Sequence, residues 1–200
     1  MRFTGICWRN AAGLTAFPAG RIAYGRMLRI RLETPNHVRL ILAPATADGL
    51  SRAVGEAHRR YTGFVNARAR ETGHLFQGRF GCAAMDEAHC LNAVRTLAFN
   101  PVRAGLNASP GEWPWSSVRA HLAGRDDALV TAQPVLDLAP RFADLLALSP
   151  GEQAALDGFE SRSANGRPLG DPEFIAFAER KLGRSLRRGK PGPRPQVKPS

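Results

Sequence analysis

Two apolar segments on either side of a proline-containing turn constrain the fold of this 200-residue chain most strongly. Residues 27–33, MLRIRLE, alternate apolar and charged side chains, which is the two-residue period of a half-buried β-strand. Residues 34–36, TPN, favour a turn, and residues 38–42, VRLIL, form a second apolar run. The pattern predicts an antiparallel β-hairpin with His37 at its mouth.

His37 and Arg39 stand two positions apart at the start of this second strand. Side chains at i and i+2 of a strand point to the same face, so we expect these two to lie side by side. A metal site would need a second histidine there. The guanidinium of Arg39 is a cation with no electron pair to donate, so it cannot replace that histidine.

Two longer segments have the apolar spacing of amphipathic helices. The first spans residues 48–69, and either Asp48 or Ser51 is suited to cap it. The second begins with Asp86 as its N-cap and is expected to end at about Asn100, because the residue before a proline disfavours helical geometry.

Shorter elements are expected around these helices. Residues 73–85 form a loop rich in glycine and aromatic residues that leads into a short strand, and residues 116–122 form a short helix. Residues 134–160 contain two short helical patterns, and residues 162–172 are expected to be a linker. An amphipathic helix over 171–182 is closed by the glycine that follows it.

The charge balance favours a nucleic-acid partner. The chain carries 28 Lys and Arg against 17 Asp and Glu, a formal net charge of +11, and nearly all of the basic residues are arginines. The planar guanidinium matches phosphate oxygens in a bidentate manner, and a basic domain of this kind is typical of nucleic-acid binders. The alternative is that the arginines reflect a GC-rich genome and only keep the protein soluble.

Cysteine usage and hydropathy indicate a cytoplasmic protein with no membrane partner. The three cysteines, Cys7, Cys82 and Cys90, are odd in number and lack the C-x-x-C spacing, which argues against a disulfide framework. No apolar run approaches the roughly 18 residues that a membrane helix needs.

Several short segments, taken together and in order, resemble one family. They are PNHVRLIL, AHRRYTGFVNAR, GHLFQGRF, MDEAH, FNPVRAGL and WPWSS, from residue 35 to residue 117. Their order and spacing are similar to those of the REP-associated tyrosine transposases, a branch of the HUH-type single-tyrosine transposases. The likeness covers about residues 29–124 and continues more weakly into 166–184.

This resemblance implies a fold and a chemistry. The implied fold is α+β, an antiparallel sheet flanked by helices with a ferredoxin-like core, followed by a helical C-terminal extension. In the family, a His-hydrophobe-His pair on a strand and a polar residue on a helix bind a divalent metal. A tyrosine four residues before that polar residue attacks single-stranded DNA and forms a 5′-phosphotyrosine link.

Only part of that machinery is present in this chain. The first metal histidine matches His37 and the third ligand matches Asn100, which could instead cap the end of its helix. Arg39 stands at the second histidine, and Thr96 stands at the nucleophilic tyrosine. We therefore expect no cofactor, whereas active members of the family use Mg or Mn. An aliphatic hydroxyl is a far worse leaving group than a phenol, whose pKa is about 10.

The resemblance also indicates residues for DNA binding. Arg39 either contacts the phosphate that the metal handles in active members or is a solvated edge residue. Of the two tyrosines, Tyr24 lies in the unmatched N-terminal region and Tyr61 is expected to belong to the core. The candidate DNA-binding residues are Arg39, Arg59, Arg60, His74, Gln77, Arg79 and Arg103.

The chain accordingly divides into four parts: a divergent segment (1–25) without a recognisable strand or helix, a transposase-like domain (26–124), a helical extension (125–185) and a basic disordered tail (186–200). The expected function is binding of single-stranded or hairpin DNA by a transposase-like protein that has lost strand cleavage. The resemblance allows either a monomer or a homodimer. The alternatives are a transposase that is active through relocated residues, or a decayed gene product or protein-interaction module.

Overall fold

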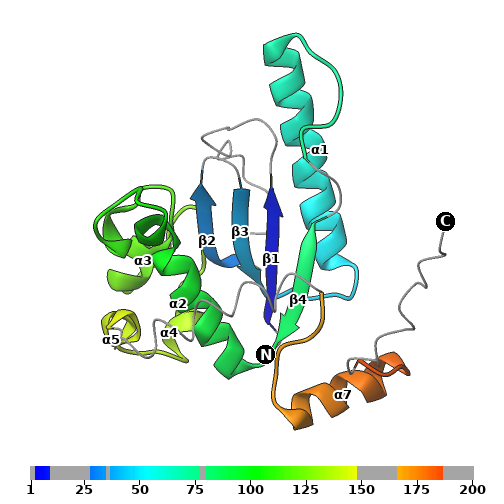
Figure 1. The fold of residues 1–200 in the computed structure, drawn as a ribbon, viewed down its shortest axis with the longest axis vertical. Coiled ribbons are helices and arrows are strands. Elements are labelled where there is room, and N and C mark those ends of the chain that lie inside the picture. Colours follow the sequence, from blue (N-terminus) through cyan, green and yellow to red (C-terminus); the bar gives the residue numbers. More distant parts are fainter. Residues whose placement is uncertain (1–2, 10–27, 35–36, 77–79, 148–165, 187–200) are drawn as a thin grey trace, which may run out of the picture.

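A four-stranded antiparallel sheet forms the centre of the protein (Figure 1). The computed structural model describes residues 3–9, 28–34, 37–76, 80–147 and 166–186. The strands are β1 (Phe3–Arg9), β2 (Leu28–Thr34), β3 (His37–Leu42) and β4 (Gly81–Met85), in the spatial order β2-β3-β1-β4. The expected α+β fold is confirmed, as is the hairpin, in which β2 pairs antiparallel with β3.

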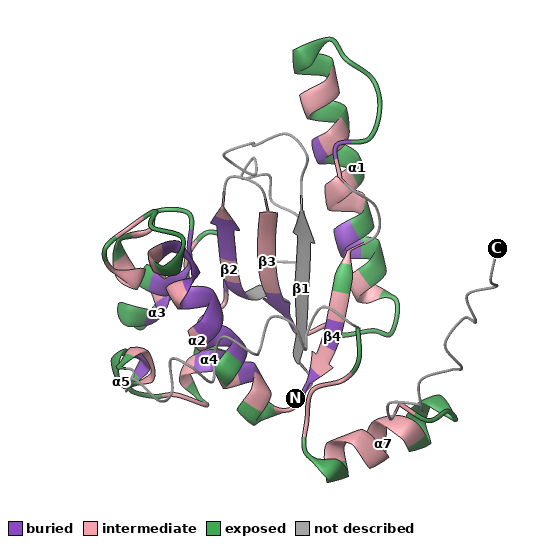
Figure 2. Cartoon of the chain, in the orientation of Figure 1, coloured by how far each residue is buried: buried purple, intermediate pink, exposed green. Residues whose placement is uncertain are grey.

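Two helices cover opposite faces of this sheet, because successive side chains of a strand alternate between its faces. Ile41 of β3 packs in a cluster with residues of α2 (Glu87–Arg103), including Val94 and Leu97. Its neighbour Leu42 packs instead with Val54 of α1 (Gly49–Ala69). Figure 2 shows that α2 is buried along much of its length, whereas α1 projects past the sheet and is more exposed.

The strand β1 corrects the expectation that residues 1–25 lack a recognisable strand. Phe3–Arg9 pairs with β3 on one side and with β4 on the other. Both of the strands with which β1 pairs come much later in the chain, so no local sequence pattern could reveal this pairing.

The end of α2 is a second correction, because the helix continues through Pro101 to Arg103. Ala104 N–H donates to the Asn100 carbonyl at 2.9 Å, and Leu106 N–H donates to the Pro101 carbonyl at 2.8 Å. Leu97, Asn100 and Pro101 are all buried. Packing of this helix face outweighs the local preference of the residue before a proline.

Both edges of the sheet are covered by other segments of the chain. At β2, Glu33 N–H donates to the Trp115 carbonyl at 2.9 Å, and Ser117 N–H donates to the Arg31 carbonyl at 3.0 Å. At β4, Leu169 N–H donates to the Ala84 carbonyl at 2.8 Å. Residues 166–172, the described part of the expected linker, are thus hydrogen-bonded to the sheet.

The remaining elements follow the sequence pattern in part: two short helices fall within the described part of residues 134–160, whereas residues 148–160 of that prediction and nearly all of the predicted tail 186–200 lie outside the described residues. These remaining elements are the 3-10 turn η1 (Pro110–Glu112), α3 (Val118–Leu122), α4 (Gln133–Leu136), α5 (Phe142–Leu146) and α7 (Pro172–Leu182). Asp171 caps α7 by accepting from Phe174 N–H at 2.7 Å, and Gly183 closes it with a positive φ of 62°. Among the described helices, none combines the length and hydropathy needed to cross a bilayer.

Candidate nucleic-acid interface

His37 and Arg39 lie on the sheet face that α2 covers. Arg39 pairs across the hairpin with Leu32, and Leu32 belongs to the same buried cluster as Ile41 and the α2 residues. Paired residues in an antiparallel ladder share a face, as do residues two apart along a strand. Arg39 is on an interior strand and half-buried, with its Nε shielded from solvent, so it is not a solvated edge residue.

A hydrogen bond to Thr34 orients the imidazole of His37. Thr34 Oγ1 donates to the His37 carbonyl at 3.0 Å and lies 2.9 Å from His37 Nδ1. A hydroxyl has one proton, so with that proton on the carbonyl, Nδ1–H donates to the oxygen. In the neutral ring this leaves the lone pair on Nε2, and Nε2 is buried. The Thr34 hydroxyl therefore fixes the orientation of the ring and directs Nε2 into the protein.

Thr96 and Asn100 lie one turn apart on the buried face of α2. Thr96 is fully buried and Asn100 is 9% exposed. Residues at i and i+4 share a helix face. The structure thus places His37 and Arg39 on the sheet face that α2 covers, and places Thr96 and Asn100 together on one buried face of α2 itself.

The side chains at the predicted metal-ligand positions do not fit a divalent metal. His37 offers one imidazole and Asn100 one amide, whereas Arg39 adds a positive charge on the same sheet face. Within the described ranges, no group of three His, Cys, Asp or Glu side chains could hold a metal ion. The hydroxyl of Thr96 donates to the Asn92 carbonyl at 2.8 Å, inside its own helix.

Two of the predicted DNA-binding arginines lie together on the exposed side of α1. Arg59 and Arg60 both bind the carboxylate of Glu56, with closest distances of 2.7 Å and 2.6 Å. Hydrogen bonds from Arg59 and then from Arg60 lower the pKa of Glu56 to about 2. The two guanidiniums, with side chains about 70% exposed, leave one net positive charge on this face.

The other predicted DNA-binding residues do not join this pair into one patch. His74 is exposed in the loop after α1, and Asn66 Nδ2 donates to the Gly73 carbonyl at 3.1 Å, which ties that loop to the helix. Arg103 is exposed in the last turn of α2, on the opposite side of the sheet. Gln77, Arg79 and Tyr24 lie outside the described residues.

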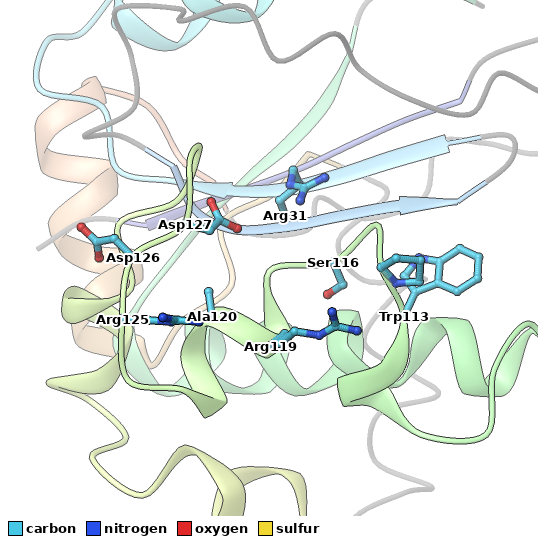
Figure 3. Close-up of a pocket in the computed structure, with 9 residues that line it drawn as sticks. Arg31, Trp113, Ser116, Arg119, Ala120, Arg125, Asp126 and Asp127 are labelled. Atoms are coloured by element: carbon cyan, nitrogen blue, oxygen red, sulfur yellow. The ribbon is translucent and has the colours of Figure 1, made fainter.

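A pocket at the β2 edge of the sheet is a feature that the sequence interpretation missed (Figure 3). Arg31, Arg119 and Arg125 line it together with Trp113. The motif WPWSS entered the sequence interpretation through the resemblance, and the arginines come from two distant segments, residue 31 on β2 and residues 119–125 in and after α3. Their convergence depends on the pairing of residues 115–117 with β2, which no local pattern predicts.

Comparisons with known proteins give one distant likeness. No protein-family model and no curated protein matches the chain. Among solved structures, the chain is similar to a REP-associated tyrosine transposase bound to a REP hairpin, with 19% sequence identity and a TM-score of 0.49. The match covers 66% of this chain and 84% of the other. A likeness at this level does not define the family or the activity of the chain.

Proposed function

We propose that this chain is a transposase-like protein that binds single-stranded or hairpin DNA and does not cleave it. The main observation against cleavage is the burial and hydrogen bonding of Thr96, which stands at the position of the expected nucleophile. Its side chain is fully buried, and its hydroxyl donates to the carbonyl of Asn92. A phosphodiester cannot approach that oxygen without displacing the side chains that pack around α2.

The chemistry of the surrounding groups supports the same conclusion. A tyrosine transposase needs a nucleophile that later serves as a leaving group, and an aliphatic alkoxide leaves far less readily than a phenolate. Arg39 contributes a cation where the mechanism needs a metal ligand. Tyr61 does not substitute as the nucleophile, because it is only 5% exposed and burial, together with the charge of Glu33, raises its pKa.

Binding is supported by the charge of the whole chain and by the exposed arginines. A net charge of +11 attracts a polyanion, and the exposed guanidiniums of Arg59, Arg60 and Arg103 can form charge-assisted hydrogen bonds to phosphates. Arg39 is proposed to stabilise the packing of α2 on the sheet and to contact a phosphate where this packing meets solvent.

The pairing of the sheet edges argues against a decayed gene product. A chain that had lost its first strand would leave the neighbouring strand exposed and unpaired. Instead β1 is an interior strand, and the edges at β2 and β4 are both hydrogen-bonded to other segments. A sharp, cooperative thermal transition is the corresponding expectation.

The test is an equilibrium titration of fluorescently labelled single-stranded and hairpin DNA, followed by anisotropy. We expect binding at low salt that is equal in magnesium and in EDTA, because no metal takes part. The logarithm of the binding constant should fall by about 0.7 per contacted phosphate for each tenfold rise in salt, as for other single-stranded complexes. Absence of binding to either DNA at low salt would refute the proposal.

Cleavage is tested separately by incubating the protein with labelled single-stranded DNA and Mn²⁺. The expected result is no covalent protein–DNA adduct on a denaturing gel. An adduct that survives denaturation would show that the chain has a working nucleophile, and would support the alternative of relocated catalytic residues.

A further inference from the structure

The pocket at the β2 edge has the composition of a binding site for an anionic, aromatic ligand. It has a volume of about 380 Å³, within the range usual for ligand sites. Its lining comes from β2, from the segment before α3, from α3 itself and from the loop after α3. The lining residues are Arg31, Trp113, Pro114, Ser116, Arg119, Ala120, Arg125, Asp126 and Asp127.

The two carboxylates of the pocket are engaged by the backbone of their own loop. Asp127 Oδ1 accepts from the N–H groups of Leu129 and Val130, each at 2.7 Å. Asp126 Oδ1 accepts from Ala132 N–H at 2.8 Å. Both side chains therefore have a structural role in shaping the loop, and three guanidiniums outnumber them in the lining.

The guanidiniums retain donors for a ligand. Neither Arg119 nor Arg125 forms an ion pair with any residue that the structure describes, and both are exposed at the mouth of the pocket. Arg31 is more buried and uses Nη1 to donate to Glu33 at 2.7 Å. Its Nε is shielded from solvent and has no hydrogen-bond partner in the described ranges. Figure 3 shows Arg119 and Ser116 toward one end, near Trp113, and Arg125 with Asp126 toward the other.

Trp113 gives the pocket a fixed aromatic wall. Its indole Nε1–H donates to the Glu33 carbonyl at 2.8 Å, and the ring packs against the main buried cluster. Pro114 follows it in the lining and limits the backbone freedom of this segment. A ring held in this way can stack on a base without losing conformational freedom on binding.

We propose that this pocket binds one nucleotide of a single strand of DNA, with its base against Trp113 and the phosphates on its two sides on Arg31, Arg119 and Arg125. The proposal rests on the proposed DNA-binding function. It assigns to that function a site that does not include His37 or Thr96. Arginine forks match phosphate oxygens, and base stacking is independent of sequence, so the subsite holds a strand without reading it.

The test compares single-stranded DNA affinities of the Arg119→Ala/Arg125→Ala variant and of Arg141→Ala. Arg141 is a matched control, since it is an exposed arginine at the N-cap of α5, outside the pocket, and forms an ion pair with Asp144. We expect the double variant to bind about tenfold more weakly and to show a smaller salt dependence, by about 0.7 per lost phosphate contact. The control should change by less than about twofold.

Each outcome separates the two proposals. If the wild-type chain binds DNA and the double variant binds as well as Arg141→Ala, the pocket assignment is overturned and the DNA-binding function stands. If the wild-type chain binds no DNA, both are overturned. Should the double variant not fold, Arg119→Glu alone replaces it, because this exposed side chain has no described ion pair to lose.

A second measurement on the wild-type chain tests the aromatic wall. An abasic strand of the same length carries the same phosphates but no bases. We expect it to bind more weakly than a thymidine strand and to leave the tryptophan fluorescence unquenched. Equal affinity and equal quenching for the two strands would overturn the proposed stacking on Trp113.

Discussion

The carboxylate of Asp86 links two helix starts that are 85 residues apart in the chain. Its Oδ1 accepts from His89 N–H at 2.8 Å and so caps α2, while its Oδ2 accepts from Asp171 N–H at 2.8 Å. Asp171 is itself the N-cap of α7. One side chain therefore caps the helix of the candidate site and also fixes the segment that leads into the C-terminal helix.

Replacing Asp86 by alanine should destabilise the protein and loosen the attachment of α7. Loss of a helix N-cap costs about 1 kcal/mol, and the Asp171 N–H loses its acceptor as well. We expect a lower thermal midpoint and faster proteolysis within residues 166–186. Asp144→Ala is the control, because Asp144 is an exposed carboxylate that pairs with Arg141 on the surface. Equal midpoints for the two variants would contradict the linking role.

The same contact makes stability depend on pH in a defined direction. Burial raises the pKa of Asp86, but hydrogen bonds from the backbone and ring of His89 and from Asp171 N–H outweigh it, so the net pKa lies below the ordinary value. A carboxylate with a depressed pKa in the folded state stabilises the fold above its unfolded pKa, and this contribution is lost as the pH falls through the folded pKa. Asp86→Ala should remove that part of the acid sensitivity.

Local patterns account for the parts of the fold that depend on neighbouring residues. The β2–β3 hairpin, the caps at Asp86 and Asp171 and the end of α7 at Gly183 all follow from short sequence signals. The interior strand β1 carries no such signal, because both of its neighbours are distant in sequence. The sequence pattern places the end of α2 too early, at Asn100, for a similar reason: tertiary packing overrides the local preference imposed by Pro101.

The candidate site divides in the same way. The shared face of His37 and Arg39 and the shared face of Thr96 and Asn100 follow from the periods of a strand and a helix. That the two faces meet is implied by the resemblance and stays a prediction. The burial of Thr96 and the pocket of Arg31 and Arg119 depend on how α2 and α3 pack, which is not encoded in any single segment.

Ser117 should be important at the β2 edge. It is fully buried, its Oγ accepts from Arg31 N–H at 3.0 Å, and its own N–H donates to the Arg31 carbonyl. Ser117→Ala leaves a partly buried N–H with one acceptor fewer, so we expect a loss of about 1–3 kcal/mol in the free energy of unfolding, measured with urea. Ser51→Ala, an exposed serine of α1, should cost less, and the reverse order would be inconsistent with this role.

Restoring a tyrosine at position 96 should strain the protein. Thr96 is fully buried on α2, so Thr96→Tyr must place a ring where the structure has room for a hydroxyl and a methyl group. Overpacking of this kind costs about 1–3 kcal/mol, and we expect a lower thermal midpoint. Thr96→Ser adds no volume and serves as the control. A tyrosine variant as stable as the wild type would mean that the packing around α2 opens readily, and that an Arg39→His/Thr96→Tyr variant could regain the DNA adduct.

Glu56 should weaken DNA binding by occupying the guanidiniums of Arg59 and Arg60. Hydrogen bonds from these two arginines hold its pKa at about 2, so it remains charged at every pH used for binding. Glu56→Gln should therefore raise the affinity for single-stranded DNA by about two- to fivefold at low salt, an effect that decreases as salt rises. Asp144→Asn removes one negative charge from α5 instead, and should raise the affinity less. If the two variants gain equally, the arginines of α1 contribute only through net charge and do not contact the DNA.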